Sequence, residues 1–107
     1  MKMTNFIVIQ DFMVKDLHLK GNYLLVYALI YGFSQDGKGI FNGSIPYIQD
    51  MTGISSHMTI YNILASLENK NLIIKLTHFN DRPNQYRANT KYNKKLLFKQ
   101  ALNMIKW

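Results

Sequence analysis

The sequence predicts an α+β, mainly α, fold in which a three-helix core is followed by a β-hairpin and an additional C-terminal helix. Three observations lead to this prediction. Apolar residues recur with the helical period in several segments, the pattern changes to an extended one after residue 71, and turn-forming residues separate the segments. The chain has 107 residues and is 48% hydrophobic, which is enough for one core but not for two. We therefore predict a single domain over residues 1–107.

The first third of the chain predicts an extended lead and two helices. Residues 5–10 are β-branched and aromatic, and form either a strand or an extended arm. A brief helix is expected from Asp11, its N-cap, to Leu17. The residues of this helix expected to face inward are Phe12, Met13 and Val14. Residues 19–33 are apolar around most of a helical circumference, so this longer helix should be buried on nearly all sides. A stripe of tyrosines at the edge of the core is expected at Tyr23, Tyr27 and Tyr31.

Residues 44–71 predict two further helices joined by a tight turn. A serine before a helix can accept a hydrogen bond from an unpaired N–H. A proline in the first turn costs little stability, because the N–H that it lacks would have no partner within the helix. A glycine ends a helix readily because it enters the left-handed conformation without a Cβ penalty. The expected boundary residues are Ser44 (first N-cap), Pro46 (first turn), Gly53 (left-handed cap), Ile54 (apolar plug) and Ser55 or Ser56 (second N-cap).

The second of these helices has two different faces. The apolar side, with the i, i+3, i+4, i+7 spacing of a core face, consists of Ile60, Ile63, Leu64 and Leu67. The opposite side consists of Met58, Asn62, Ala65 and Asn69. No acidic residue lies on this side, since Glu68 is placed toward the core, and the helix is expected to end at Asn71. Such a pair of helices is typical of a helix-turn-helix that reads DNA, and an ordinary helical hairpin is the alternative.

The remaining segments predict a small sheet and a terminal helix. Residues 72–79 and 85–90 have extended patterns, and the turn formers of residues 80–84 join them into a hairpin. Residues 39–42 form a further short strand, and residues 92–107 form an amphipathic helix. A hairpin directly behind a helix-turn-helix is the wing of a winged helix. We therefore predict a winged helix-turn-helix with the helix-turn-helix at 44–71, the wing at 72–90 and the C-terminal helix at 92–107.

Basic residues are concentrated in the second part of the chain. The formal net charge is +7. Residues 1–69 contain four lysines against five carboxylates, whereas residues 70–107 contain nine lysines and arginines against Asp81 alone. A positive block directly after a candidate reading helix is expected where a protein contacts phosphates. We therefore favour a polyanion as the partner over a basic surface that only aids solubility.

Two stretches carry a resemblance to a known family. They read LHLKGNYLLVYALIYGFSQDG at Leu17–Gly37 and FNGSIPYI at Phe41–Ile48. Within residues 5–75 the chain resembles the N-terminal domains of replication initiator and replisome-organiser-like proteins of bacterial phages and plasmids. The resemblance implies duplex DNA binding at an origin or an operator. Such domains usually show a basic pair after the Ile-Ser that opens the reading helix, whereas Ile54-Ser55 is followed here by Ser56, His57 and Met58.

We expect the second helix of the pair to enter the major groove of double-stranded DNA. Asn62 is the best base reader, because its amide can pair bidentately with adenine. The lysines and arginines that follow would neutralise phosphates and position the domain without reading sequence. The full set of expected DNA-binding residues is Ser55, Ser56, His57, Met58, Thr59, Tyr61, Asn62, Ser66, Lys70, Lys75, Arg82 and Arg87.

Other classes of function fit the sequence less well. The six carboxylates are scattered, the three histidines lie far apart and no phosphate-cradling glycine loop follows a strand, so we expect no catalytic residues, metal or cofactor. The absence of cysteine favours a reducing cytoplasm, and no apolar run is long enough for a membrane span. A transcriptional regulator with the same fold is one alternative. A protein-interaction module that uses Met58 and Tyr61 is another, and the C-terminal helix can pair two copies into a homodimer.

Overall fold

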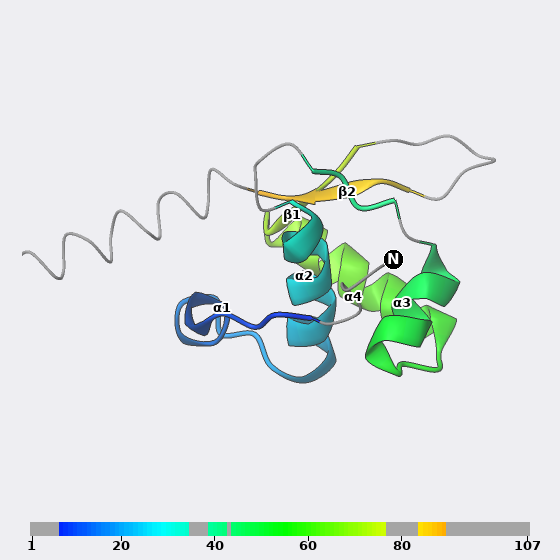
Figure 1. Cartoon of the computed structure of the whole chain (residues 1–107), viewed down its shortest axis with the longest axis horizontal. Coiled ribbons are helices and arrows are strands. Elements are labelled where there is room, and N and C mark those ends of the chain that lie inside the picture. The colour runs from blue at the N-terminus through cyan, green and yellow to red at the C-terminus, as the bar shows by residue number, and fades with distance from the viewer. Residues whose placement is uncertain (1–6, 35–38, 43, 77–83, 90–107) are drawn as a thin grey trace, which may run out of the picture.

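The computed structural model describes residues 7–34, 39–42, 44–76 and 84–89. In chain order its elements are α1 (Asp11–Lys15), α2 (Gly21–Phe33), α3 (Ile45–Thr52), α4 (His57–Asn69), β1 (Ile73–Lys75) and β2 (Tyr86–Ala88). Figure 1 shows the hairpin of β1 and β2 across one end of α2, with α1 and α3 on opposite sides of that helix. This is the predicted α+β winged helix, mainly helical with a small antiparallel sheet.

The core forms where α2 meets α3, α4 and β2. Five consecutive residues in the middle of α2, Val26–Ile30, are buried, because neighbouring elements cover this part of the helix from several directions. The two ends of α2 reach the surface, so the predicted burial on nearly all sides holds only for its middle. Of the three tyrosines of α2, Tyr27 is buried, Tyr31 is half-buried and Tyr23 is exposed. The stripe therefore lies at the core edge as expected, with one end in solvent.

The sheet brings three segments together. β1 and β2 are antiparallel, with Ile73 opposite Ala88, Ile74 opposite Arg87 and Lys75 opposite Tyr86. On the other side of β2, the backbone of Phe41 exchanges two hydrogen bonds with Tyr86, at 2.7 and 3.1 Å. The strand predicted at residues 39–42 is thus a single bridge at Phe41. β2 lies between this bridge and β1, which makes it the central strand.

Gly39 allows the chain to approach the end of α2. A Cβ atom at this position would lie 1.6 Å from the carbonyl oxygen of Phe33. No side chain fits in that space, and the close approach is what brings Phe41 alongside β2. The Phe41 ring then lies against Phe33 and Tyr47, with centroids 5.2 and 6.0 Å away.

Several predicted boundaries differ from the observed ones. Asp11 is not the N-cap of α1 but its first residue; Gln10 takes the cap position without a side-chain hydrogen bond. This helix ends at Lys15 rather than Leu17, and Val14 is 45% exposed, because a helix of this length can turn only part of its circumference to α2. Phe12 and Met13 are buried as predicted. The long helix begins at Gly21 rather than residue 19, since the backbone is extended at Lys20.

The second half of the chain contains shorter elements than predicted. α4 ends at Asn69, and Asn71, two residues later, is the left-handed residue, with φ of 63°. β1 and β2 each span three residues, within the predicted 72–79 and 85–90. Three predicted features lie outside the described residues. They are the hairpin turn at 80–84 (apart from Asn84), Arg82, and the C-terminal helix at 92–107 with its expected homodimer contact.

Candidate nucleic-acid interface

Local hydrogen bonds hold α3 and the turn that follows it. Ser44 caps α3 by accepting a hydrogen bond from the N–H of Tyr47, and Gly53 ends that helix with φ of 79°, as predicted. The Thr52 hydroxyl donates to the carbonyl of Ile48 at 2.6 Å and accepts from the N–H of Ile54 at 3.3 Å. These bonds satisfy backbone groups that the end of a helix leaves unpaired. The path of the chain into α4 is therefore specified locally.

The entrance to α4 is fixed by a second set of contacts. Ser56 is the N-cap, since its hydroxyl accepts a hydrogen bond from the N–H of Thr59 at 3.2 Å. The side-chain amide of Gln49 in α3 donates to the carbonyl of Ser55 at 2.8 Å. Ile54 is buried and anchors the turn to the core. Of the two serines left open by the sequence, Ser56 is thus the cap, and Ser55 is held through its backbone.

α4 separates its apolar and polar residues as the periodicity predicts. Ile60, Ile63, Leu64 and Leu67 are buried. On the opposite side Asn62, Ala65 and Asn69 are exposed, and Met58 is 66% exposed. Within the described part of the chain, the Asn62 amide has no hydrogen-bond partner. A polar helix face that the domain itself leaves uncovered is available to a ligand.

One flank of α4 faces the hairpin. Tyr61 and Glu68 are two helical turns apart and lie on the same side of α4. On β2, burial raises the pKa of the Tyr86 hydroxyl, a hydrogen bond with Asn84 lowers it, and electrostatic interactions with Glu68 and Tyr61 raise it further. Lys75 lies opposite Tyr86 in the register, so its side chain leaves the sheet on the same face. Lys75 therefore projects from the face of the sheet that packs on the helices, as Tyr86 does.

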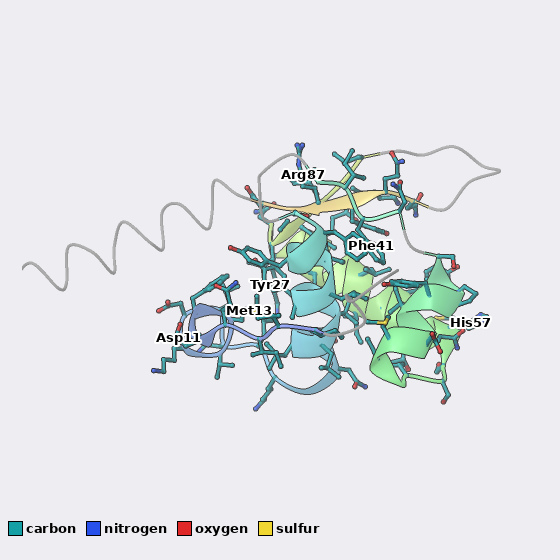
Figure 2. The ribbon with its side chains drawn as sticks, in the orientation of Figure 1. Asp11, Met13, Tyr27, Phe41, His57 and Arg87 are labelled. Carbon is teal, nitrogen blue, oxygen red and sulfur yellow. The ribbon has the colours of Figure 1, made fainter. Side chains whose placement is uncertain are left out.

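The other cations of the predicted site lie elsewhere. Lys70, directly after α4, has its Nζ atom 5.8 Å from the centroid of the Tyr23 ring in α2. Arg87 lies between the buried residues Tyr86 and Ala88 on β2, so its side chain leaves the opposite face of the sheet from theirs. Figure 2 shows Arg87 directed away from α2, on the far side of the hairpin from His57.

The structure thus gathers some of the predicted site residues and separates others. The residues gathered along α4 and at its entrance are Ser55, Ser56, His57, Met58, Thr59, Tyr61, Asn62 and Ser66. Lys75 lies on the face of the hairpin that packs on the helices, and Lys70 lies at the other end of α4. Arg87 is not brought to the exposed face of α4, and Arg82 lies outside the described residues. Thr59 and Ser66 are half-buried, whereas Asn62 is exposed.

Three residues support the site in ways that the sequence did not predict. Gln49 holds the turn, Tyr23 contacts Lys70, and the buried Tyr86 lies opposite Lys75 in the sheet. The sequence shows that Gln49 lies near the end of α3. Its contact with the carbonyl of Ser55 could not be predicted, because this contact depends on the angle between two helices. The alternation of β2 could have indicated that Tyr86 faces inward, since its neighbours two residues apart point to the same side.

The site suits non-covalent binding. Among residues 7–34, 39–42, 44–76 and 84–89 no three histidine, cysteine, aspartate or glutamate residues gather as they would around a metal ion. No helix in the described part of the chain is long and apolar enough to cross a membrane. The groups on the exposed face of α4 are an amide, hydroxyls, a thioether and a methyl, which form hydrogen bonds and apolar contacts.

Comparison with known proteins defines the fold of this chain. No protein-family model matches the sequence, and no curated protein matches it. Two solved structures do. One, described as "N-Terminal domain of DNA binding protein", has a TM-score of 0.56 and 19% sequence identity, covering 78% of this chain and 72% of that one. The other, described as "Structure of Rep-DNA complex", has a TM-score of 0.55 and 18% identity, covering 78% and 73%. The chain shares the fold of these domains.

Proposed function

We propose that this chain binds double-stranded DNA and that α4 is the helix that enters the major groove. The observation that carries the proposal is the exposed face of α4, where Met58, Asn62 and Ala65 project from a helix whose entry is fixed by Gly53 and Ser56. A helix of this width fits the major groove, and its amide and methyl groups match base edges. One of the similar structures is of a DNA-binding protein and the other is of a Rep–DNA complex.

Within this proposal the residues of the site have separate tasks. Asn62 reads a base through its amide, Ala65 permits close approach of the helix backbone, and Met58 contacts a thymine methyl. Ser55, Ser56, His57, Thr59, Tyr61 and Ser66 contact base edges and phosphates around them. Lys70 and Lys75 neutralise phosphates on the two sides of α4, and Arg82 adds a further cation from the hairpin. The chain acts without catalysis, cofactor or small-molecule substrate, in the cytoplasm.

The proposed process is initiation of replication on a phage or plasmid. It is supported by the resemblance of residues 5–75 to replication initiator domains, and by the description of one similar structure as a Rep–DNA complex. Transcriptional regulation through the same fold is the second candidate. The two are separated in cells by cloning the bound sequence: an origin function maintains a plasmid that has no other origin, whereas an operator function represses a reporter gene.

DNA binding is tested by titrating the whole chain against duplex DNA. A random pool of duplexes yields the bound sequence, and fluorescence anisotropy then compares that duplex with a scrambled one at several salt concentrations. The logarithm of the association constant should fall linearly with the logarithm of salt concentration, by about 0.9 for each phosphate contact. The alternative is a protein-interaction module that uses Met58, which is 66% exposed, and Tyr61, which is 53% exposed. Such a module would bind without this salt dependence, and that result would overturn the proposal.

Base reading is tested with a matched pair of asparagine variants. Asn62→Ala should reduce the preference for the selected duplex over the scrambled one by about 1–3 kcal/mol. Asn22→Ala, an exposed asparagine near the start of α2, is the control, since it removes the same group outside α4. Equal preference in both variants would show that Asn62 does not read a base.

A further inference from the structure

Tyr23 is the exposed end of the tyrosine stripe on α2. Its side chain is 38% exposed, whereas Tyr27, one helical turn later, is buried. Tyr27 and Tyr31 stack on each other with ring centroids 6.0 Å apart, but within the described residues the Tyr23 ring has no aromatic partner. The packing of the core therefore does not account for an aromatic ring at this position.

The ring of Tyr23 contacts the side chain of Lys70, which comes directly after α4. The Nζ atom of Lys70 lies 5.8 Å from the centroid of the ring, within the distance at which the negative face of an aromatic ring attracts an ammonium. No carboxylate of the described residues forms an ion pair with Lys70. The contact joins two helices that are far apart in the sequence, so the tertiary structure restrains this lysine side chain.

The backbone at Lys70 is held in place as well. The N–H of Lys70 donates to the carbonyl of Ser66 at 3.0 Å. The next residue, Asn71, has the left-handed φ of 63°, and its carbonyl accepts a hydrogen bond from the side-chain amide of Asn89 at 2.9 Å. Because the backbone is fixed and the ring restrains the side chain, the Lys70 ammonium occupies a restricted region although the residue is exposed.

Lys70 continues one flank of α4. Thr59, Ser66 and Lys70 are spaced seven and four residues apart, which puts them on one stripe along the helix. Ser66 also follows Asn62 by four residues, so this stripe borders the exposed face of α4. When the exposed face lies in a major groove, the DNA backbones run along its borders. A phosphate on this border would meet the Lys70 ammonium.

We propose that Tyr23 is a positioning residue for DNA binding, whose ring holds the Lys70 ammonium where a backbone phosphate lies when α4 occupies the major groove. The inference rests on the proposed DNA binding. A free lysine side chain loses rotamer freedom when it binds a phosphate, and one already held on a ring loses less. The ammonium has three N–H donors, so it can lie over the ring and still donate to a phosphate. Tyr23 therefore raises the affinity for every duplex without reading a base.

The central experiment compares Tyr23→Leu, Tyr23→Phe and the wild type in anisotropy titrations with the selected and the scrambled duplex. Leucine removes the ring, whereas phenylalanine keeps the ring and removes the hydroxyl. Tyr23→Leu should weaken binding to both duplexes about two- to fivefold, as expected for the loss of an exposed cation–π contact, and leave the preference between them unchanged. Tyr23→Phe should bind like the wild type. An equal loss in both variants would refute a role of the ring.

A double-mutant cycle with Lys70→Met tests whether the effect passes through Lys70. In the Lys70→Met background, Tyr23→Leu should cause no further loss of affinity. Lys70→Met alone should reduce the salt slope by up to about 0.9, because a phosphate contact is lost. Tyr23→Leu alone should leave the slope near that of the wild type, because the ammonium still reaches the phosphate. Lys15→Met, at an exposed lysine of α1, is the control for net charge and should change the slope less than Lys70→Met.

The contact between ring and ammonium is measured in the free chain by nuclear magnetic resonance. An aromatic ring shifts protons that lie over its face upfield, so the Hε protons of Lys70 should resonate upfield of those of Lys15. Tyr23→Leu should abolish this shift, and Tyr23→Phe should keep it. Thermal unfolding verifies that each variant is folded; Tyr23→Leu should unfold close to the wild type, since Tyr23 lies outside the core.

The outcomes separate this inference from the proposed function. If the wild type binds duplex DNA with a salt-dependent affinity and Tyr23→Leu binds as tightly or more tightly, the role of Tyr23 is refuted and DNA binding stands. A loss that persists in the Lys70→Met background, or an unshifted Lys70 resonance, also refutes it. If the wild type shows no salt-dependent binding to any duplex, the proposed function itself fails, and the inference fails with it.

Discussion

The hydroxyl of Ser34 accepts a hydrogen bond from the backbone N–H of Ala88 at 3.1 Å, although the two residues are 54 positions apart. The same hydroxyl donates to the carbonyl of Ile30 at 3.0 Å. Ala88 is on the side of β2 that faces the Phe41 bridge, and this bridge is too short to pair with it. The buried Ser34 at the end of α2 therefore accepts the hydrogen bond that a neighbouring strand would otherwise accept. It links the central strand of the sheet to α2.

Replacing this serine should destabilise the protein. Ser34→Ala leaves the buried N–H of Ala88 without a partner, which should lower the free energy of unfolding by about 1–3 kcal/mol. Urea denaturation followed by circular dichroism measures the change. Ser55→Ala is the control: Ser55 is exposed and contributes its carbonyl rather than its hydroxyl to the turn, so the midpoint should barely move. Equal midpoints for the two variants would contradict the role of Ser34.

Two glycines provide a test of the left-handed turn before α4. A Cβ atom would meet no neighbour within 4 Å at either Gly53 or Gly32, so steric contact is the same for both. Gly53→Ala forces alanine to φ of 79° and should cost about 1 kcal/mol of unfolding free energy. Gly32→Ala lies in α2 and should stabilise the protein by about 0.5–1 kcal/mol. Thermal unfolding of both variants should therefore shift in opposite directions, and a parallel shift would exclude a strained turn.

The two described cations of the hairpin should differ in their effect on DNA binding. Lys75 projects from the face of the sheet that packs on the helices, whereas Arg87 projects from the opposite side of the sheet, as Figure 2 shows. Lys75→Met should weaken binding to every duplex and reduce the salt slope by up to about 0.9. Arg87→Met should leave the slope unchanged. Anisotropy titrations over a range of salt concentrations measure both, and a larger loss for Arg87→Met would place the DNA on the other side of the hairpin.

Tyr86 should make the stability of the protein depend on alkaline pH. Burial raises the pKa of its hydroxyl above the ordinary value of 10.0. The unfolded state then loses this proton at a lower pH than the folded state, so the free energy of unfolding falls as the pH rises above about 10. Tyr86→Phe should remove that part of the decrease. Urea midpoints measured between pH 8 and 11 for the wild type and this variant give the comparison.

Much of the helical architecture could be predicted because its determinants are local. The cap at Ser44, the left-handed Gly53 and the apolar spacing from Ile60 to Leu67 each depend on residues within two helical turns. The prediction failed where an element's limits depend on its neighbours. Asp11 resembled a cap from its side chain alone, but Gln10 takes the cap position without a side-chain hydrogen bond and α1 starts at Asp11. The strands were also predicted too long.

The candidate site divides in a similar way. The exposed face of α4 followed from the sequence, since the buried side of an amphipathic helix determines the opposite side. The positions of the basic residues did not follow from it. Lys75 and Arg87 looked equivalent as charges on a hairpin, and only the register of β1 with β2 assigns them to opposite faces. Tyr23 as a support for Lys70 required the packing of α2 against α4.

The amino-acid sequence by itself determined the fold class, the helix-turn-helix and the side of α4 that stays out of the core, because periodicity, capping and turn chemistry act over a few residues. Only the tertiary structure decided which cation of the hairpin faces the helices, and that Ser34 takes the place of a strand next to Ala88. Both depend on strand register and on contacts between segments far apart in the chain. No local pattern encodes such contacts, since they form only when the whole core is assembled.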